Sequence, residues 1–123
     1  MIAHATLAVA DCGRAKAFYL KALAPLGYQT NMDFGEAVGF TDGKNTDFWI
    51  AERETVTPLH LAFEAKSQWE VEAFHEAALA AGGKNNGEPG YRAEYWPGYY
   101  AAFVHDLDGN NVEAVWYDYE KAG

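Results

Sequence analysis

The sequence predicts an α+β fold made of two βαβββ modules, whose strands form a curved mixed-sheet half-barrel, or cup, with the helices outside. The first observation is length, since 123 residues suffice for one domain, expected to span 1–123. The second is that each half of the chain contains one helical pattern among several short strand patterns. The third is an internal repeat. Pairs of identical residues mark it in a single register: His4 and His60, Phe18 and Phe74, Leu23 and Leu79, Gly27 and Gly83.

The first module is expected at residues 1–53. Apolar and β-branched residues predict a strand at 2–9, which stops at Asp11, a good helix N-cap. Apolar residues then recur at helical spacing from 11 to 26, and Gly27 is expected to end that helix. Short strands separated by turn residues should follow at 28–32, 37–41 and 47–51.

The second module is expected at residues 58–119 and begins with a strand at 59–64. Ser67 and Glu70 fit a capping box at the start of the second helix, and the two glycines at 82–83 are expected to end it. His75 lies among polar residues of this helix, so we expect it to be exposed. The remaining strands are expected at 84–88, 100–105 and 111–117.

Composition and charge exclude several classes of partner. The chain has 18 acidic and 9 basic residues and a net charge of −9, which disfavours nucleic acid and anionic membrane surfaces. Its one cysteine, Cys12, excludes an internal disulfide and a cysteine-rich zinc site. No signal peptide and no apolar run of membrane-spanning length are visible, so the expected location is the cytoplasm.

Several segments of the sequence carry a family resemblance. They are residues 2–7 with 17–19 behind them, 47–50, 60–63 and 106–113. These segments resemble the vicinal oxygen chelate superfamily, which contains glyoxalase I, bleomycin-resistance proteins, fosfomycin-resistance enzymes and extradiol dioxygenases. The resemblance covers nearly the whole chain and implies paired βαβββ modules around a metal-binding cup. It is specific for the fold rather than the reaction, because the superfamily hosts several chemistries.

The resemblance implies metal ligands on the first and last strands of the modules. Carried over by position, these ligands are His4, His60 and Glu113, and Glu113 is also the expected catalytic carboxylate. Where glyoxalase I carries a further ligand this sequence has Trp49, and the acidic Asp47 lies just before it. Two imidazoles and a carboxylate suit a divalent Fe, Mn, Ni or Zn ion and leave positions open for substrate oxygens. Alternatively, both histidines are hydrogen-bonded pocket residues that bind no metal.

The second copy contains an aromatic insert at residues 89–100 that the first copy lacks. It contains more aromatic residues than a solvent-exposed loop without a function would be expected to have, and glycine and proline residues interrupt it. One interpretation is a flap over the cup that binds a small organic substrate. The other is a packed loop or a dimer contact. Including Trp49, which would project into the cup, the candidate substrate-binding residues are Trp49, Tyr91, Arg92, Tyr95, Trp96 and Tyr100.

Two functions remain open at this point. The first is a glyoxalase-like, metal-dependent enzyme acting on a small oxygen-bearing substrate chelated to the metal, in a lyase, isomerase or dioxygenase reaction. The second is a metal-free protein that binds or sequesters a small molecule, as bleomycin-resistance proteins do, for which an acidic, aromatic cup suits a flat cation. The family often forms dimers, so a homodimer is expected, with the aromatic end at 115–119 as a candidate interface.

Overall fold

The first module is a four-stranded sheet with one helix packed on one of its faces. The computed structural model describes all residues from 1 to 123. In chain order the module comprises β1 (Ala5–Val9), α1 (Cys12–Leu23), the 3₁₀ turn η1 (Ala24–Leu26), β2 (Gln29–Asp33), β3 (Ala37–Thr41) and β4 (Thr46–Glu52). The strand order is β1-β4-β3-β2, in which β1 runs parallel to β4 and the other neighbours are antiparallel.

The second module repeats this architecture. Its elements are β5 (His60–Glu64), α2 (Gln68–Ala80), β6 (Lys84–Tyr91), β7 (Tyr99–His105) and β8 (Asn111–Tyr117), followed by the short helix α3 (Tyr119–Ala122). The strand order β5-β8-β7-β6, with β5 parallel to β8, is the order of the first sheet. The predicted α+β fold of two βαβββ modules is therefore confirmed.

Local chemistry sets the helix boundaries. The Asp11 side chain accepts a hydrogen bond from the Arg14 backbone N–H at 3.0 Å, which caps α1. Ser67 caps α2 by accepting from the Glu70 backbone N–H at 3.1 Å. Gly27 follows η1 at a φ of 85°, in the left-handed region that favours glycine, as expected. Helix α1 is shorter than expected because the chain tightens into the 3₁₀ turn.

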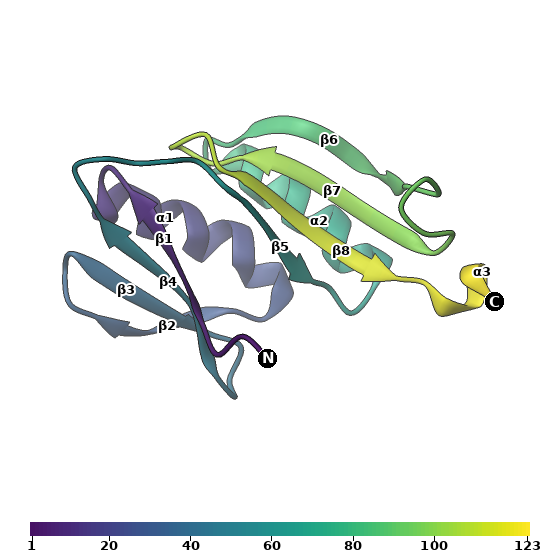
Figure 1. Cartoon of the computed structure of the whole chain (residues 1–123), viewed down its shortest axis with the longest axis horizontal. Helices are drawn as coiled ribbons and strands as arrows, with labels where there is room; N and C mark the ends of the chain where they lie inside the picture. The colour runs from purple at the N-terminus through teal and green to yellow at the C-terminus, as the bar shows by residue number, and fades with distance from the viewer.

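The two modules share one hydrophobic core. In Figure 1 both helices lie behind the two sheets, and α1 contacts α2. A single cluster of 23 buried residues draws members from both modules. Across the boundary the rings of Phe48 and Phe63 pack edge to face with centroids 5.1 Å apart, and the buried Tyr19 hydroxyl donates to the Asp106 carboxylate. Each sheet thus has one face covered by helix and one open face.

The structure differs from two expectations in the second module. Strand β6 extends to Tyr91, beyond the expected 84–88, so the aromatic insert begins within a β-hairpin. His75 is buried rather than exposed, and its Nε2 shares a hydrogen bond of 2.9 Å with Oδ1 of Asn85. That expectation was wrong because α2 packs against β6, a contact that helical periodicity does not reveal. No helix in the chain combines the length and apolarity needed to cross a membrane.

Candidate functional site

The open face of the second sheet carries the candidate site. Along β8, Val112 and Ala114 are buried in the core between helices and sheet, so Glu113 between them points to the opposite face. The strand register places Ala62 of β5 and Phe103 of β7 on either side of Glu113. The position of Glu113 in this sheet follows from strand alternation alone.

Glu113 is 1% exposed even though no helix covers it. Its Oε1 lies 2.7 Å from Nε2 of His60, and its Oε2 accepts a hydrogen bond from the Tyr99 hydroxyl. Burial and the hydrogen bond to Glu113 raise the pKa of Tyr99 well above its usual range, so this hydroxyl stays a donor at neutral pH. The His60 side chain is 53% exposed, so the imidazole is the part of the network that a ligand can reach.

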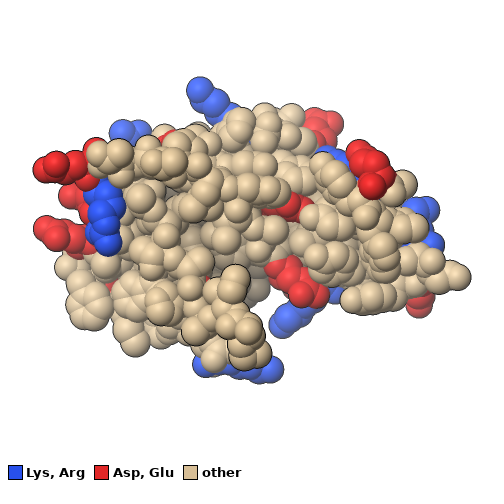
Figure 2. Space-filling view, in the orientation of Figure 1, with Lys and Arg blue, Asp and Glu red and all other residues tan.

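Aromatic rings surround this network on the open face. The ring of Phe103 lies 6.1 Å from that of His60. Beyond it, toward the C-terminus, is a group of edge-packed and tilted rings that we call the aromatic cluster: Tyr95, Trp96, Tyr99, Tyr117 and Tyr119. In Figure 2 most charged side chains lie at the margins of the face turned to the viewer, and acidic atoms also show near its middle among uncharged residues. The surface beside Glu113 thus suits a flat, largely apolar body.

Trp49 lies on the open face of the first sheet. Its ring covers Gly39, its cross-strand partner, where an added Cβ would meet Cζ2 of Trp49 at 2.9 Å. The Phe34 ring lies parallel to the indole, with centroids 6.2 Å apart and an interplanar angle of 4°. Trp49 therefore places its indole against the sheet rather than leaving this position open.

The predicted metal ligands are only partly brought together. His60 and Glu113 are in contact, whereas His4 lies exposed ahead of β1. No group of three or more His, Cys, Asp or Glu side chains in the chain could hold a metal ion. Both oxygens of Glu113 are also engaged by His60 and Tyr99. The donors within one chain therefore do not fit a metal that needs three protein ligands.

The candidate residues of the insert divide between the two faces of the sheet. The Arg92 guanidinium lies 5.4 Å from the Phe103 ring centroid and donates to two backbone carbonyls, at 2.8 Å and 2.7 Å, on the site side. Tyr100 is buried on the helix side, where it donates to Glu72 at 2.6 Å and burial raises its pKa to about 12. The Tyr91 hydroxyl donates to Asp118 at 2.7 Å, and its ring packs on Tyr100.

Sequence reasoning missed three residues of this face: Tyr99, Phe103 and Tyr117. Side chains alternate between the two faces along a strand, so Tyr117 of β8 lies on the same face as Glu113. The cross-strand partners of Glu113 and Tyr117 in β7 are Phe103 and Tyr99, which therefore lie on that face too. The expected start of this strand at Tyr100 concealed the pattern, because β7 begins one residue earlier. The register of the β7–β8 hairpin, rather than any sequence motif, was the feature from which these residues could have been predicted.

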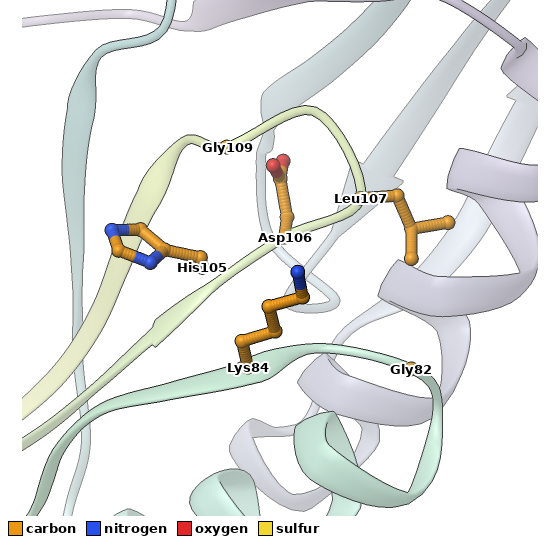
Figure 3. Close-up of a pocket in the computed structure, with 6 residues that line it drawn as sticks. All are labelled: Gly82, Lys84, His105, Asp106, Leu107 and Gly109. Atoms are coloured by element: carbon orange, nitrogen blue, oxygen red, sulfur yellow. The ribbon is translucent and has the colours of Figure 1, made fainter.

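A separate hollow of about 350 Å³ lies at the turn between β7 and β8 (Figure 3). Lys84, His105 and Asp106 are among the residues that line it. The Asp106 carboxylate already accepts hydrogen bonds from the Asp108 and Asn110 backbone N–H groups and from Tyr19. These bonds give Asp106 the role of holding the turn against α1, and they leave it little capacity for a ligand.

The chain is similar to proteins of known family. Residues 1–114 match the model of the glyoxalase/bleomycin resistance protein/dioxygenase superfamily. Among solved structures, a glyoxalase/bleomycin resistance protein from Albidiferax ferrireducens T118 is 27% identical, with a TM-score of 0.80 over 93% of this chain and 96% of that one. A family enzyme from Burkholderia phytofirmans PsJN is 17% identical, with a TM-score of 0.75 over 95% and 98% of the two chains.

A lactoylglutathione lyase from Agrobacterium tumefaciens is also similar, at 21% identity and a TM-score of 0.68 over 94% of this chain and 92% of that one. At this identity the likeness concerns the fold alone. Among curated proteins, none is significantly similar in sequence.

Proposed function

Because the chain belongs to the glyoxalase/bleomycin resistance protein/dioxygenase superfamily, we propose that it binds a small organic molecule against the open face of its second sheet. The binding centre is the network of Glu113, His60 and Tyr99, and the aromatic cluster beside it receives the flat part of the ligand. The observation that carries this proposal is the burial of Glu113 on a sheet face that no helix covers.

Stability alone does not account for a carboxylate at this position. Ala101, Phe103 and Val115 form a small buried apolar group on the same face, which an aliphatic side chain at position 113 would extend. Removing a carboxylate from water costs several kcal/mol unless its partners compensate. A buried carboxylate whose hydrogen-bond partner is a half-exposed histidine is the arrangement expected of a group that meets a ligand.

The network can move a proton as well as bind. Glu113 holds the His60 ring by one nitrogen, while the rest of the exposed ring can face the ligand. The Tyr99 hydroxyl fixes the other carboxylate oxygen, so Glu113 cannot turn away from the histidine. This pair could accept a proton from a bound hydroxyl or acidic C–H, which is the step that an isomerase or lyase reaction needs.

A metal-dependent enzyme is the second candidate. One observation favours it: Nε2 of His60 and Oε1 of Glu113 are neighbouring donors of the types that Fe, Mn, Ni and Zn accept. One chain does not complete the ligand set, so this candidate requires a homodimer in which a second copy supplies its own His4. A divalent ion held there would act as a Lewis acid on chelated substrate oxygens, in a lyase, isomerase or dioxygenase reaction.

The first test is a thermal-shift screen of a fragment library on the untagged chain and on two variants. Glu113→Gln replaces the carboxylate of the proposed site, which accepts a hydrogen bond from Tyr99. Glu72→Gln is the matched control, because Glu72 accepts a hydrogen bond from Tyr100 on the helix side of the sheet, away from the site. We expect hits that stabilise the native chain and the Glu72→Gln variant but not the Glu113→Gln variant. A screen in which no hit depends on the Glu113 carboxylate would contradict the proposal.

Metal content and mass separate the two candidates. Elemental mass spectrometry and sedimentation should be measured on protein made without a polyhistidine tag or chelator. A stoichiometric metal in a dimer, lost together with turnover in His4→Ala and His60→Ala variants, would establish the metal-dependent enzyme. A metal-free chain that takes up no added ion, yet binds fragments through Glu113, would establish the metal-free binding protein.

A further inference from the structure

A groove of about 430 Å³ lies at the seam between the two modules, and we call it the seam groove. It runs along the outer edge of β5 and reaches the start of β1 and the end of η1. His60, Glu113 and Tyr99 do not line it. Its volume falls in the range of sites for small organic ligands, roughly 300–1,000 Å³. Ala62, the cross-strand neighbour of Glu113, is among its lining residues, so the groove adjoins the open face but is a candidate site separate from the network of Glu113, His60 and Tyr99.

The lining of the seam groove is mainly apolar and comes from both modules. Phe48 of β4 meets Phe63 of β5 edge to face with centroids 5.1 Å apart, and Tyr28 packs on Phe63 at 5.5 Å. Leu26 and Leu61 complete this apolar surface. Phe48, Phe63 and Leu26 are already buried and held by the core, so they form a preorganised surface. The apolar surface that a ligand would newly cover belongs mainly to Tyr28, Leu61 and the exposed Ile2.

Acidic groups converge on one end of the groove. The Tyr28 hydroxyl lies 2.9 Å and 3.1 Å from the two carboxylate oxygens of Asp47, to which it donates. Asp42 lines the same end, and backbone hydrogen bonds from Lys44 and Asn45 lower its pKa, so it is ionised at neutral pH. The pKa of Tyr28 is raised well above its usual range by burial, then by the hydrogen bond and charge of Asp47 and the charge of Asp42.

The charges around the groove do not balance. Its acidic lining residues are Asp42, Asp47 and Glu64, whereas its one basic lining residue is Lys66. No ion pair within 4.0 Å joins any of these side chains to an opposite charge. Carboxylates beside an aromatic surface attract an organic cation through both charge and the ring faces, and they repel an anion.

We propose that the seam groove is a second binding site, for a small organic amine. The ammonium group faces Asp47 and Asp42, and the aromatic or aliphatic body lies against Phe48 and Phe63. A neutral molecule of the same shape would gain only the apolar contact, so the groove discriminates by charge. This site does not depend on the function proposed for Glu113.

The probes are tryptamine and tryptophol, which share an indole and a two-carbon arm but differ in carrying an amine or a hydroxyl. Each is titrated into the ¹⁵N-labelled full chain at neutral pH, and binding is read from amide chemical shifts. Tryptamine is expected to shift the amides of Gly27, Tyr28, Asp47 and Phe63, and to bind at least about fivefold more tightly than tryptophol.

Three variants sharpen the test. Asp47→Asn keeps an acceptor for Tyr28 but removes the charge, so it should weaken tryptamine at least about fivefold and leave tryptophol unchanged. Ala5→Phe places a ring in the groove from a half-buried position and should block both probes. Glu113→Gln should leave tryptamine binding at the seam groove unchanged, even if it abolishes the fragment hits of the open face.

Three results would overturn the proposal. The first is tryptamine shifts confined to amides around His60, Tyr99 and Phe103, which would place the amine on the open face. The second is equal affinity for tryptamine and tryptophol in the native chain. The third is the absence of shifts at the seam up to millimolar tryptamine, in a chain whose spectrum shows it to be folded.

Discussion

Replacing Tyr99 by phenylalanine isolates the hydrogen bond that seals Glu113. The change removes one hydroxyl and leaves Oε2 of Glu113, which has no other donor in the structure, without a partner. Because Glu113 is 1% exposed, water does not replace the lost donor. An unsatisfied buried acceptor costs about 1–3 kcal/mol, and a charged one lies toward the upper end. Tyr99→Phe should therefore lower the free energy of unfolding by about 2–3 kcal/mol.

The adjacent residue supplies a matched control. Tyr100→Phe also removes one hydroxyl from β7, but its acceptor Glu72 is solvent-exposed and has a second donor in Gln68, at 3.2 Å. The loss should therefore be clearly smaller than for Tyr99→Phe. Urea unfolding of both variants at pH 7 measures the difference. An equal decrease in the free energy of unfolding for both variants, or a larger decrease for Tyr100→Phe, would refute the claim that Glu113 is shielded from water.

Further predictions concern the core and the first sheet. Burial and Asp106 raise the pKa of Tyr19 well above its usual value of about 10, so only the unfolded chain releases this proton near that pH. The free energy of unfolding should therefore fall as the pH rises above about 10, and it should fall less steeply in Tyr19→Phe. Urea unfolding of both proteins over this pH range measures the two slopes, and equal slopes would contradict the prediction. Phe63→Ala should cost about 3–5 kcal/mol by calorimetry, because the ring packs across the module boundary, whereas a loss below about 1 kcal/mol would argue against a shared core. Gly39→Ala should displace the Trp49 ring and move its indole N–H resonance, with amides of the second sheet as the unaffected control; an unmoved indole resonance would contradict the packing.

The fold could be predicted because its determinants are local. Asp11 and Ser67 cap their helices as their residue types indicate, and Gly27 ends the first helical segment in the left-handed conformation. The repeat then predicted that the βαβββ unit occurs twice, and the structure shows the same strand order in both sheets. The capping and turn signals depend on residues a few positions apart, and the repeat is a comparison of the chain with itself, so a single sequence contains both in full.

The candidate site was less predictable because it depends on strand register. The register of β7 places Tyr99 opposite Tyr117 on the open face, and it places Tyr100 on the helix side, where it donates to Glu72. Tyr100 was expected at the site because it belongs to the aromatic insert, and the insert alone does not reveal this register. The position of His4 depends on how the two modules pack, and no periodicity within a module determines that. His75 likewise became buried through contact of α2 with β6.

The most direct test of the central claim is the location of a bound ligand. The tightest hit from the fragment screen should be titrated into the ¹⁵N-labelled chain and followed by amide chemical shifts. The account predicts that the largest shifts fall on His60, Tyr99, Phe103 and Glu113, and that they disappear in Glu113→Gln. Shifts that avoid this face, or that persist in Glu113→Gln with undiminished affinity, would contradict the assignment of the Glu113 network as the binding centre.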